Sequence, residues 1–285
     1  MAIIAKASEW TPEKALADMD NNRVKTAILS ITTPGIWSGD PEATCNLARK
    51  SNDYAAQLVK DNPARFGFFA AIPLPDTEGA LREIAYALDT LKADGIGLMT
   101  SYGNKWPGDN AYIRVFDELN RRKAVVYIHP TAADCCRDLM SDVPAPLIEF
   151  PHDTTRAITS LLYSGTFARC RDIRFVFSHA GGTIPILAGR VAQLGTLFGN
   201  DKKVPNGVEY ELKRLYYEIA NSANRSAMSA LMNLVPTSQI LFGSDSPFVP
   251  TAVTADGLTS LGLSTKDLEA IRRGNALRLF PRLKP

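Results

Sequence analysis

The stretch that decides the fold is Ala124-Val125-Val126-Tyr127-Ile128-His129, an apolar run of strand length that ends on a histidine. A similar run from Ile173 to His179 ends on a second histidine, and a third from Gln239 to Asp245 ends on an aspartate. Short apolar runs of this kind are typical of strands that are buried on both faces of a parallel sheet. We therefore predict parallel strands with polar side chains at their carboxyl ends.

The same pattern extends over the whole chain. It predicts four more strands, Val24 to Ile31, Phe66 to Ile72, Gly95 to Met99 and Arg214 to Ala220. Longer amphipathic stretches lie between the strands, and a proline after a capping residue marks two helix starts. The expected helices begin at Thr11-Pro12-Glu13 and Asp40-Pro41-Glu42, or span Thr77 to Lys92, Asn110 to Arg122 and Asp153 to Ala168. No linker interrupts the alternation, so we expect a single α/β domain over residues 1–285.

The number of strands decides between two α/β architectures. A doubly wound sheet usually carries a glycine-rich phosphate turn after its first strand, and no such turn occurs here. A (β/α)₈ barrel needs eight strands, and the pattern supplies seven. If the chain forms a barrel, its first strand is missing or is replaced by Ala2-Ile3-Ile4-Ala5.

Composition excludes several classes of function. The 32 Lys and Arg residues balance 30 Asp and Glu residues to a net charge of +2, which argues against a nucleic-acid partner. No apolar run approaches the ~18 residues that cross a bilayer, and no signal peptide opens the chain, so we expect no membrane partner and a cytoplasmic location. The cysteines at 45, 135, 136 and 170 are expected to be reduced thiols.

Three polar residues at strand ends are the candidate site. Because the carboxyl ends of barrel strands converge on one mouth, His129, His179 and Asp245 can meet a single ligand there. Two imidazoles and a carboxylate are ligands that zinc and similar ions accept. The alternative is structural: a single strand-end histidine is commonly just hydrogen-bonded, and Asp245 can cap a turn.

The segment after His179 is the second candidate. Gly181 and Gly182 allow close approach of the backbone to a bound group, and Thr183 can cap the following helix. Arg190 lies two turns along that helix. It can grip a substrate carboxylate with two hydrogen bonds, or it can be an ordinary solvated arginine.

Four segments, taken together, resemble the amidohydrolase-related family of metal-dependent decarboxylases. They are Tyr127-Ile128-His129-Pro130-Thr131, Phe177-Ser178-His179-Ala180-Gly181-Gly182, Leu187-Ala188-Gly189-Arg190 and Leu241-Phe242-Gly243-Ser244-Asp245-Ser246-Pro247-Phe248. The resemblance implies a TIM barrel in which the seven expected strands are the second to the eighth. It implies that His129 and Asp245 bind a divalent metal, zinc or alternatively manganese, and that His179 and Asp245 serve in catalysis.

The resemblance also implies a reaction and a partner. The expected activity is a non-oxidative carboxy-lyase that protonates the carboxylate-bearing carbon of a small aromatic or muconate-like acid and releases carbon dioxide. Arg190 is expected to bind the substrate carboxylate of the neighbouring subunit across a homodimer interface. A metal-dependent hydrolase of a lactone, ester or amide would use the same ligands, so it remains an alternative.

One departure from the family concerns its first strand, which carries a His-x-His pair of metal ligands. No histidine precedes His129 in this sequence. Either Met1 is an internal methionine of a longer protein, or the barrel is open and its metal site incomplete. We expect the first, because an absent inner strand leaves backbone groups of the neighbouring strands unpaired, at ~1–3 kcal/mol for each buried group. An inactive barrel that serves as a binding partner is the remaining alternative.

Overall fold

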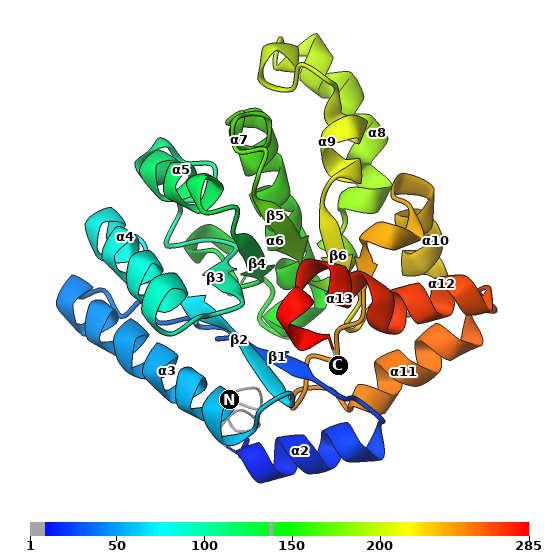
Figure 1. The fold of residues 1–285 in the computed structure, drawn as a ribbon. Coiled ribbons are helices and arrows are strands. Elements are labelled where there is room, and N and C mark those ends of the chain that lie inside the picture. The colour runs from blue at the N-terminus through cyan, green and yellow to red at the C-terminus, as the bar shows by residue number, and fades with distance from the viewer. Residues whose placement is uncertain (1–8, 137–138, 285) are drawn as a thin grey trace.

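The computed structural model describes residues 9–136 and 139–284, and its centre is a curled sheet of parallel strands (Figure 1). Seven strands occur in the described chain, and their order in the sheet is their order in the sequence. Each strand pairs in parallel with the next, so the sheet curls and its carboxyl ends share one rim. The strands are β1 (Ala27–Leu29), β2 (Phe66–Ala71), β3 (Gly95–Met99), β4 (Val125–His129), β5 (Arg174–Phe177), β6 (Tyr216–Glu218) and β7 (Ile240–Leu241).

The seven predicted strands are confirmed, but five of them end earlier than the sequence suggested, and two of these early ends concern the candidate site. β5 stops at Phe177 and β7 at Leu241, so neither His179 nor Asp245 belongs to a strand. The physical reason is the backbone: φ is +52° at His179 and +58° at Asp245, a left-handed conformation that a strand cannot contain. Both side chains are therefore presented by the turns that follow the strands.

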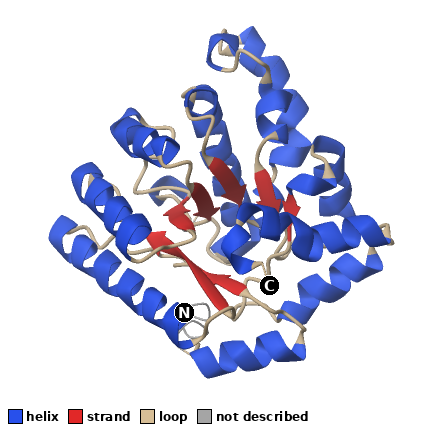
Figure 2. Cartoon of the chain, in the orientation of Figure 1, coloured by secondary structure: helices blue, strands red, loops and turns tan. Residues whose placement is uncertain are grey.

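All but the last of the α-helices surround the sheet as an outer ring (Figure 2). The α-helices of the described chain are α2 (Pro12–Asn21), α3 (Pro41–Asp61), α4 (Thr77–Ala85), α5 (Ile113–Arg121), α6 (Ala145–Tyr163), α7 (Thr166–Arg169), α8 (Ile184–Leu197), α9 (Val208–Lys213), α10 (Arg225–Leu234), α11 (Thr251–Ser260), α12 (Thr265–Glu269) and α13 (Asn275–Leu279). The predicted starts at Thr11 and Asp40 are confirmed, because each side chain accepts a backbone N–H of its helix. None of the described helices has both the length and the apolar character that a membrane span requires.

The prediction for α6 was wrong at both ends. The helix begins at Ala145, eight residues before the predicted start at Asp153. Asp153 therefore lies inside the helix, where its carboxylate is fully buried and accepts hydrogen bonds from the hydroxyls of Thr100 (2.5 Å) and Ser101 (2.9 Å). At the other end, the left-handed Gly165 separates α6 from the short helix α7, so no single helix reaches Ala168.

Apolar side chains fill both sides of the sheet. A large core lies between the strands and the helices, and a smaller cluster fills the inside of the curl at the amino ends of the strands. In that inner cluster, Leu279, which ends α13, and Phe280, which follows it, pack with Phe69 of β2. Arg282 then binds the nearly buried Asp94 with two hydrogen bonds, of 2.6 and 3.0 Å. The last helix thus plugs the end of the curl that lies opposite the candidate site.

The curl has an open side between β1 and β7. In the described chain these two strands do not pair with each other, and helices α2 and α11 lie next to one another on that side (Figure 1). Thr251, at the start of α11, donates a 2.6 Å hydrogen bond to Asp18 of α2. The expected substitute strand Ala2-Ile3-Ile4-Ala5 lies outside the described residues. The four cysteines are free thiols, as predicted.

Candidate metal and proton-transfer site

The side chains of His129, His179 and Asp245 meet at the carboxyl rim, as the sequence predicted, and their binding of one ligand stays a prediction. Asp245 lies between the two imidazoles: its Oδ1 is 3.8 Å from His129 Nε2, and its Oδ2 is 3.5 Å from His179 Nε2. The two imidazole ring centres are 5.9 Å apart. All three side chains are largely buried, with exposed fractions of 8% for His129, 11% for His179 and 18% for Asp245.

The orientation of His129 follows from its place at the end of β4. Its Nδ1 lies 3.0 Å from the carbonyl oxygen of Pro130. When Nδ1–H donates to that carbonyl, the proton occupies this nitrogen and Nε2 presents its lone pair toward Asp245. This is the tautomer that a histidine metal ligand needs.

Left-handed backbone conformations cluster at the rim. Besides His179 and Asp245, Asn221 has a φ of +57°, and it follows β6 by three residues. Its side-chain amide donates a 2.8 Å hydrogen bond to Asp245 Oδ2. Asn, Asp and His adopt this conformation more readily than other residues besides glycine, but it is still less favourable for them than the right-handed one. Its recurrence at these positions and at Ala180 indicates that the surrounding fold fixes the backbone of the site.

The charges of the site reinforce one another. Burial opposes ionisation of Asp245, but the imidazoles of His129 and His179, which lie within 4 Å of its oxygens, outweigh this effect and hold the pKa of Asp245 below its usual range. Burial also opposes protonation of His179, yet the Asp245 carboxylate 3.5 Å away and the negative charge of Glu218 raise the pKa of His179 above its ordinary value. The site therefore favours an ionised carboxylate between imidazoles.

The donor chemistry of this site fits one side of a divalent ion. His129 Nε2 and Asp245 Oδ1 face each other, and the buried His179 Nε2 has no hydrogen-bond partner among the described residues. No group of three or more His, Cys, Asp or Glu side chains able to hold a metal occurs in residues 9–136 and 139–284. An ion held between His129 and Asp245 would need further groups to complete its coordination.

The segment after His179 partly matches its predictions. Thr183 stands at the start of α8, but its hydroxyl pairs with that of Thr155 (2.8 Å) and does not cap the helix. Gly182 has a φ of +66°, and a Cβ there would lie 2.0 Å from the carbonyl oxygen of Pro151. The glycine therefore permits close packing against α6, and approach of the backbone to a bound group stays a prediction.

Arg190 lies two turns along α8, as predicted, and is exposed. Within the described chain its guanidinium forms no ion pair and makes no hydrogen bond to His129, His179 or Asp245. The structure of one chain therefore leaves the role of Arg190 as a prediction.

Sequence reasoning missed three polar residues near the mouth. Glu218 ends β6, and Asn221 lies in the turn after it. Asp153 anchors the loop after β3. A signal for Glu218 was present, since it is a charged residue in an otherwise apolar strand. Asp153 gave no signal, because an aspartate that precedes a helical pattern normally indicates a helix cap.

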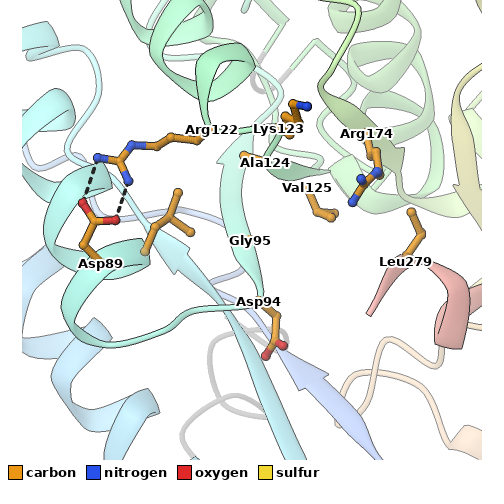
Figure 3. A pocket seen from close by; sticks show the side chains of 10 residues that line it. Asp89, Asp94, Gly95, Arg122, Lys123, Ala124, Val125, Arg174 and Leu279 are labelled. Atoms are coloured by element: carbon orange, nitrogen blue, oxygen red, sulfur yellow. Dashed lines mark hydrogen bonds and ion pairs between the residues drawn. The ribbon is translucent and has the colours of Figure 1, made fainter. Parts of the chain in front are cut away.

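A pocket of about 350 Å³ lies at the opposite, amino-terminal ends of β3, β4 and β5 (Figure 3). Arg122 is bound there by both carboxylate oxygens of Asp89, while Lys123, Arg174 and Leu279 also line the pocket. Catalytic residues of β/α barrels lie at the carboxyl ends of the strands, so this pocket is separate from the candidate site.

Comparison with known proteins gives consistent results. A model of the amidohydrolase family matches residues 5–282. A decarboxylase of Aspergillus niger (yanB) is 41% identical over 97% of this chain and 80% of its own length. The 6-methylsalicylic acid decarboxylase of Aspergillus aculeatus is 38% identical over 96% of this chain and 87% of its own length. Among solved structures, a dihydroxybenzoic acid decarboxylase of Polaromonas with bound manganese superposes with a TM-score of 0.85 over 97% of this chain and 87% of its own, at 22% identity.

Proposed function

This chain belongs to the amidohydrolase family, and from that premise we propose that it is a metal-dependent carboxy-lyase that removes carbon dioxide from a small aromatic acid without an oxidant. The arrangement of Asp245 between His129 and His179 at the carboxyl rim carries the proposal. The similarity to the 6-methylsalicylic acid decarboxylase supports the substrate class, a benzoic acid with an ortho hydroxyl group.

We propose that His129 and Asp245 hold the metal, as zinc or manganese. The ion, when bound, supplies a positive charge that orients the carboxylate and the adjacent hydroxyl of the substrate. Asn221 supports this role because its amide fixes Asp245 Oδ2 and leaves Oδ1 facing His129 Nε2. A carboxylate fixed in this way loses little conformational freedom when it binds a ligand.

His179 is the proposed proton donor. Its Nε2 is buried next to Asp245 and makes no hydrogen bond to any described group, so it is available to a substrate atom. Protonation of the carboxylate-bearing carbon makes the ring an electron sink. The bond between that carbon and the carboxylate then breaks, its electron pair restores the aromatic ring, and carbon dioxide leaves. A proton from water returns to His179, which closes the cycle.

A homodimer is the proposed assembly, with Arg190 reaching the partner's substrate carboxylate. Arg190 lies on α8, whose surface includes the large apolar residues Ile186 and Leu197, with exposed fractions of 76% and 72%. Phe198, which ends the helix, is 73% exposed. Neighbouring exposed apolar side chains of this size are typical of a protein interface. A second copy of this chain, packed on this surface of α8, would bring Arg190 near the substrate of that copy.

The test is release of carbon dioxide from 6-methylsalicylate and 2,6-dihydroxybenzoate by the purified protein, with added Zn²⁺ or Mn²⁺. We expect stoichiometric carbon dioxide and the corresponding phenol from at least one acid, and no turnover by His179→Gln. Opening of an aromatic lactone without release of carbon dioxide would instead identify a hydrolase. Inactivity toward acids and lactones, together with an absence of bound metal, would support a non-catalytic barrel.

A further inference from the structure

Glu218 is a buried carboxylate that points into the curl beside the candidate site. It is the last residue of β6, and side chains alternate along this strand: Tyr216 packs with the inner cluster, whereas Tyr217 belongs to the outer core. Glu218 therefore faces inward, with only 6% of its surface exposed. In the described chain no cationic side chain forms an ion pair with it, which is unusual for a buried acid.

Both oxygens of Glu218 are used by backbone N–H groups. Oε1 accepts a 2.9 Å hydrogen bond from the N–H of His179, and Oε2 accepts a 2.7 Å bond from the N–H of Ala220. The first bond joins Glu218 to a residue with left-handed backbone geometry, at a φ of +52°. A charged acceptor at this N–H stabilises the backbone conformation of His179.

The segment that carries Asp245 also closes over Glu218. A Cβ built on Gly243 would lie 1.8 Å from Glu218 Oε2, so only glycine lets the chain pass this close. Glu218 therefore contacts the two turns that present His179 and Asp245. Since each of its oxygens accepts a backbone N–H, the carboxylate is suited to hold these turns.

We infer that Glu218 is a positioning residue of the reaction: it fixes the backbone of His179 so that the imidazole Nε2 faces Asp245. The inference rests on the proposed function, because it assigns His179 the proton transfer. Beyond that function, the inference assigns Glu218 the orientation of the His179 imidazole, and it assigns Gly243 the space that the Glu218 carboxylate needs.

Glu218→Gln is the test, because the amide keeps the shape but turns one acceptor into a donor that faces a backbone N–H. We expect kcat for the accepted aromatic acid to fall about 10- to 100-fold, with KM within about threefold of wild type. Glu83→Gln and Glu211→Gln are the matched controls, since both acids are buried but pair with Arg49 and Arg171 and, in the described chain, form no hydrogen bond to His179 or to the segment of Asp245. These controls should keep wild-type kcat, even where they lower the melting temperature.

A second measurement separates this inference from the proposed function. The chain contains only three histidines, so the imidazole signals of ¹⁵N-labelled protein can be assigned with His152→Gln and His179→Gln. The His179 signal should shift in Glu218→Gln and stay in place in Glu83→Gln, whether or not the protein is a decarboxylase. If Glu218→Gln does not fold, Glu218→Asp replaces it, because this change withdraws both oxygens and keeps the charge. Wild-type kcat, or an unmoved His179 signal, in a folded Glu218 variant would overturn the inference.

Discussion

Thr251 and Asp18, 233 positions apart in the sequence, are joined by a 2.6 Å hydrogen bond between the Thr251 hydroxyl and the Asp18 carboxylate. The same carboxylate oxygen lies 3.5 Å from the hydroxyl of Ser246, the residue after Asp245. The bond connects α2 to α11 on the open side of the sheet. The ring of helices is thus tied together where the described strands are not.

Removal of this bond should destabilise the fold. We expect Thr251→Val to lower the free energy of unfolding by about 1–2 kcal/mol, because it leaves a carboxylate oxygen of Asp18 without its closest donor. Thr254→Val, one turn further along α11, is the control: the Thr254 hydroxyl is buried and has no described hydrogen-bond partner, so valine should be neutral or stabilising. Urea unfolding of both variants measures the difference. Equal losses would show that the bond contributes nothing.

Metal retention should depend on two of the three site residues. We expect His129→Ala and Asp245→Ala to lose the bound metal, since each removes a donor atom that faces the other. His179→Ala should keep the metal and lose turnover. Plasma mass spectrometry of the dialysed proteins gives the metal content, and a full complement in Asp245→Ala would refute the assignment.

The amide of Asn221 should affect catalysis more than stability. Asn221→Gly removes the hydrogen bond to Asp245 while it accommodates the left-handed backbone, so we expect kcat to fall about 10-fold or more with a melting temperature near that of wild type. Asn224→Gly provides the comparison, because Asn224 caps α10 through Ala227 and is remote from the carboxylate. It should leave kcat unchanged. A normal kcat in Asn221→Gly would remove Asn221 from the site.

Arg190→Ala should weaken substrate binding without unfolding the chain. Loss of a charged hydrogen bond to a carboxylate costs ~1.5–3 kcal/mol, or about 10- to 150-fold in KM. Because the arginine is proposed to act in the partner's site, mixtures of Arg190→Ala with His179→Ala subunits should recover part of the activity. Analytical ultracentrifugation tests the dimer, and the KM tests the contact with the substrate. An unchanged KM would refute the binding of the substrate carboxylate by Arg190.

Low pH should remove the stabilisation that the ionised Glu118 gives to the folded chain. Hydrogen bonds from Arg121, opposed by burial and supported by Arg122, lower the pKa of Glu118 to about 2. Its pKa is lower in the folded than in the unfolded chain, so the stabilisation is complete above the ordinary pKa and disappears as pH falls toward 2. We expect Glu118→Gln to lose about 1 kcal/mol at pH 7, and this deficit to shrink between pH 4.5 and pH 2. A deficit independent of pH would contradict the ion-pair explanation.

The sequence predicted the strands and the meeting of three side chains well, because burial leaves an apolar run of fixed length and parallel strands share one rim. It did not predict that His179 and Asp245 lie beyond their strands, since left-handed geometry at a residue other than glycine leaves no local pattern. The role of Asp153 was equally hidden: its partners Thr100 and Ser101 are about fifty positions away, and its burial arises only when α6 packs against the rim.

The left-handed backbones of His179, Asn221 and Asp245 set two kinds of selection against each other. A laboratory selection for heat resistance alone would drive these positions toward glycine, which adopts that geometry without strain. A selection for turnover would retain the imidazole, the amide and the carboxylate. Evolved variants that gain stability by relaxing this rim should therefore lose activity first, whereas gains made elsewhere, such as at Thr254, should be free of that conflict.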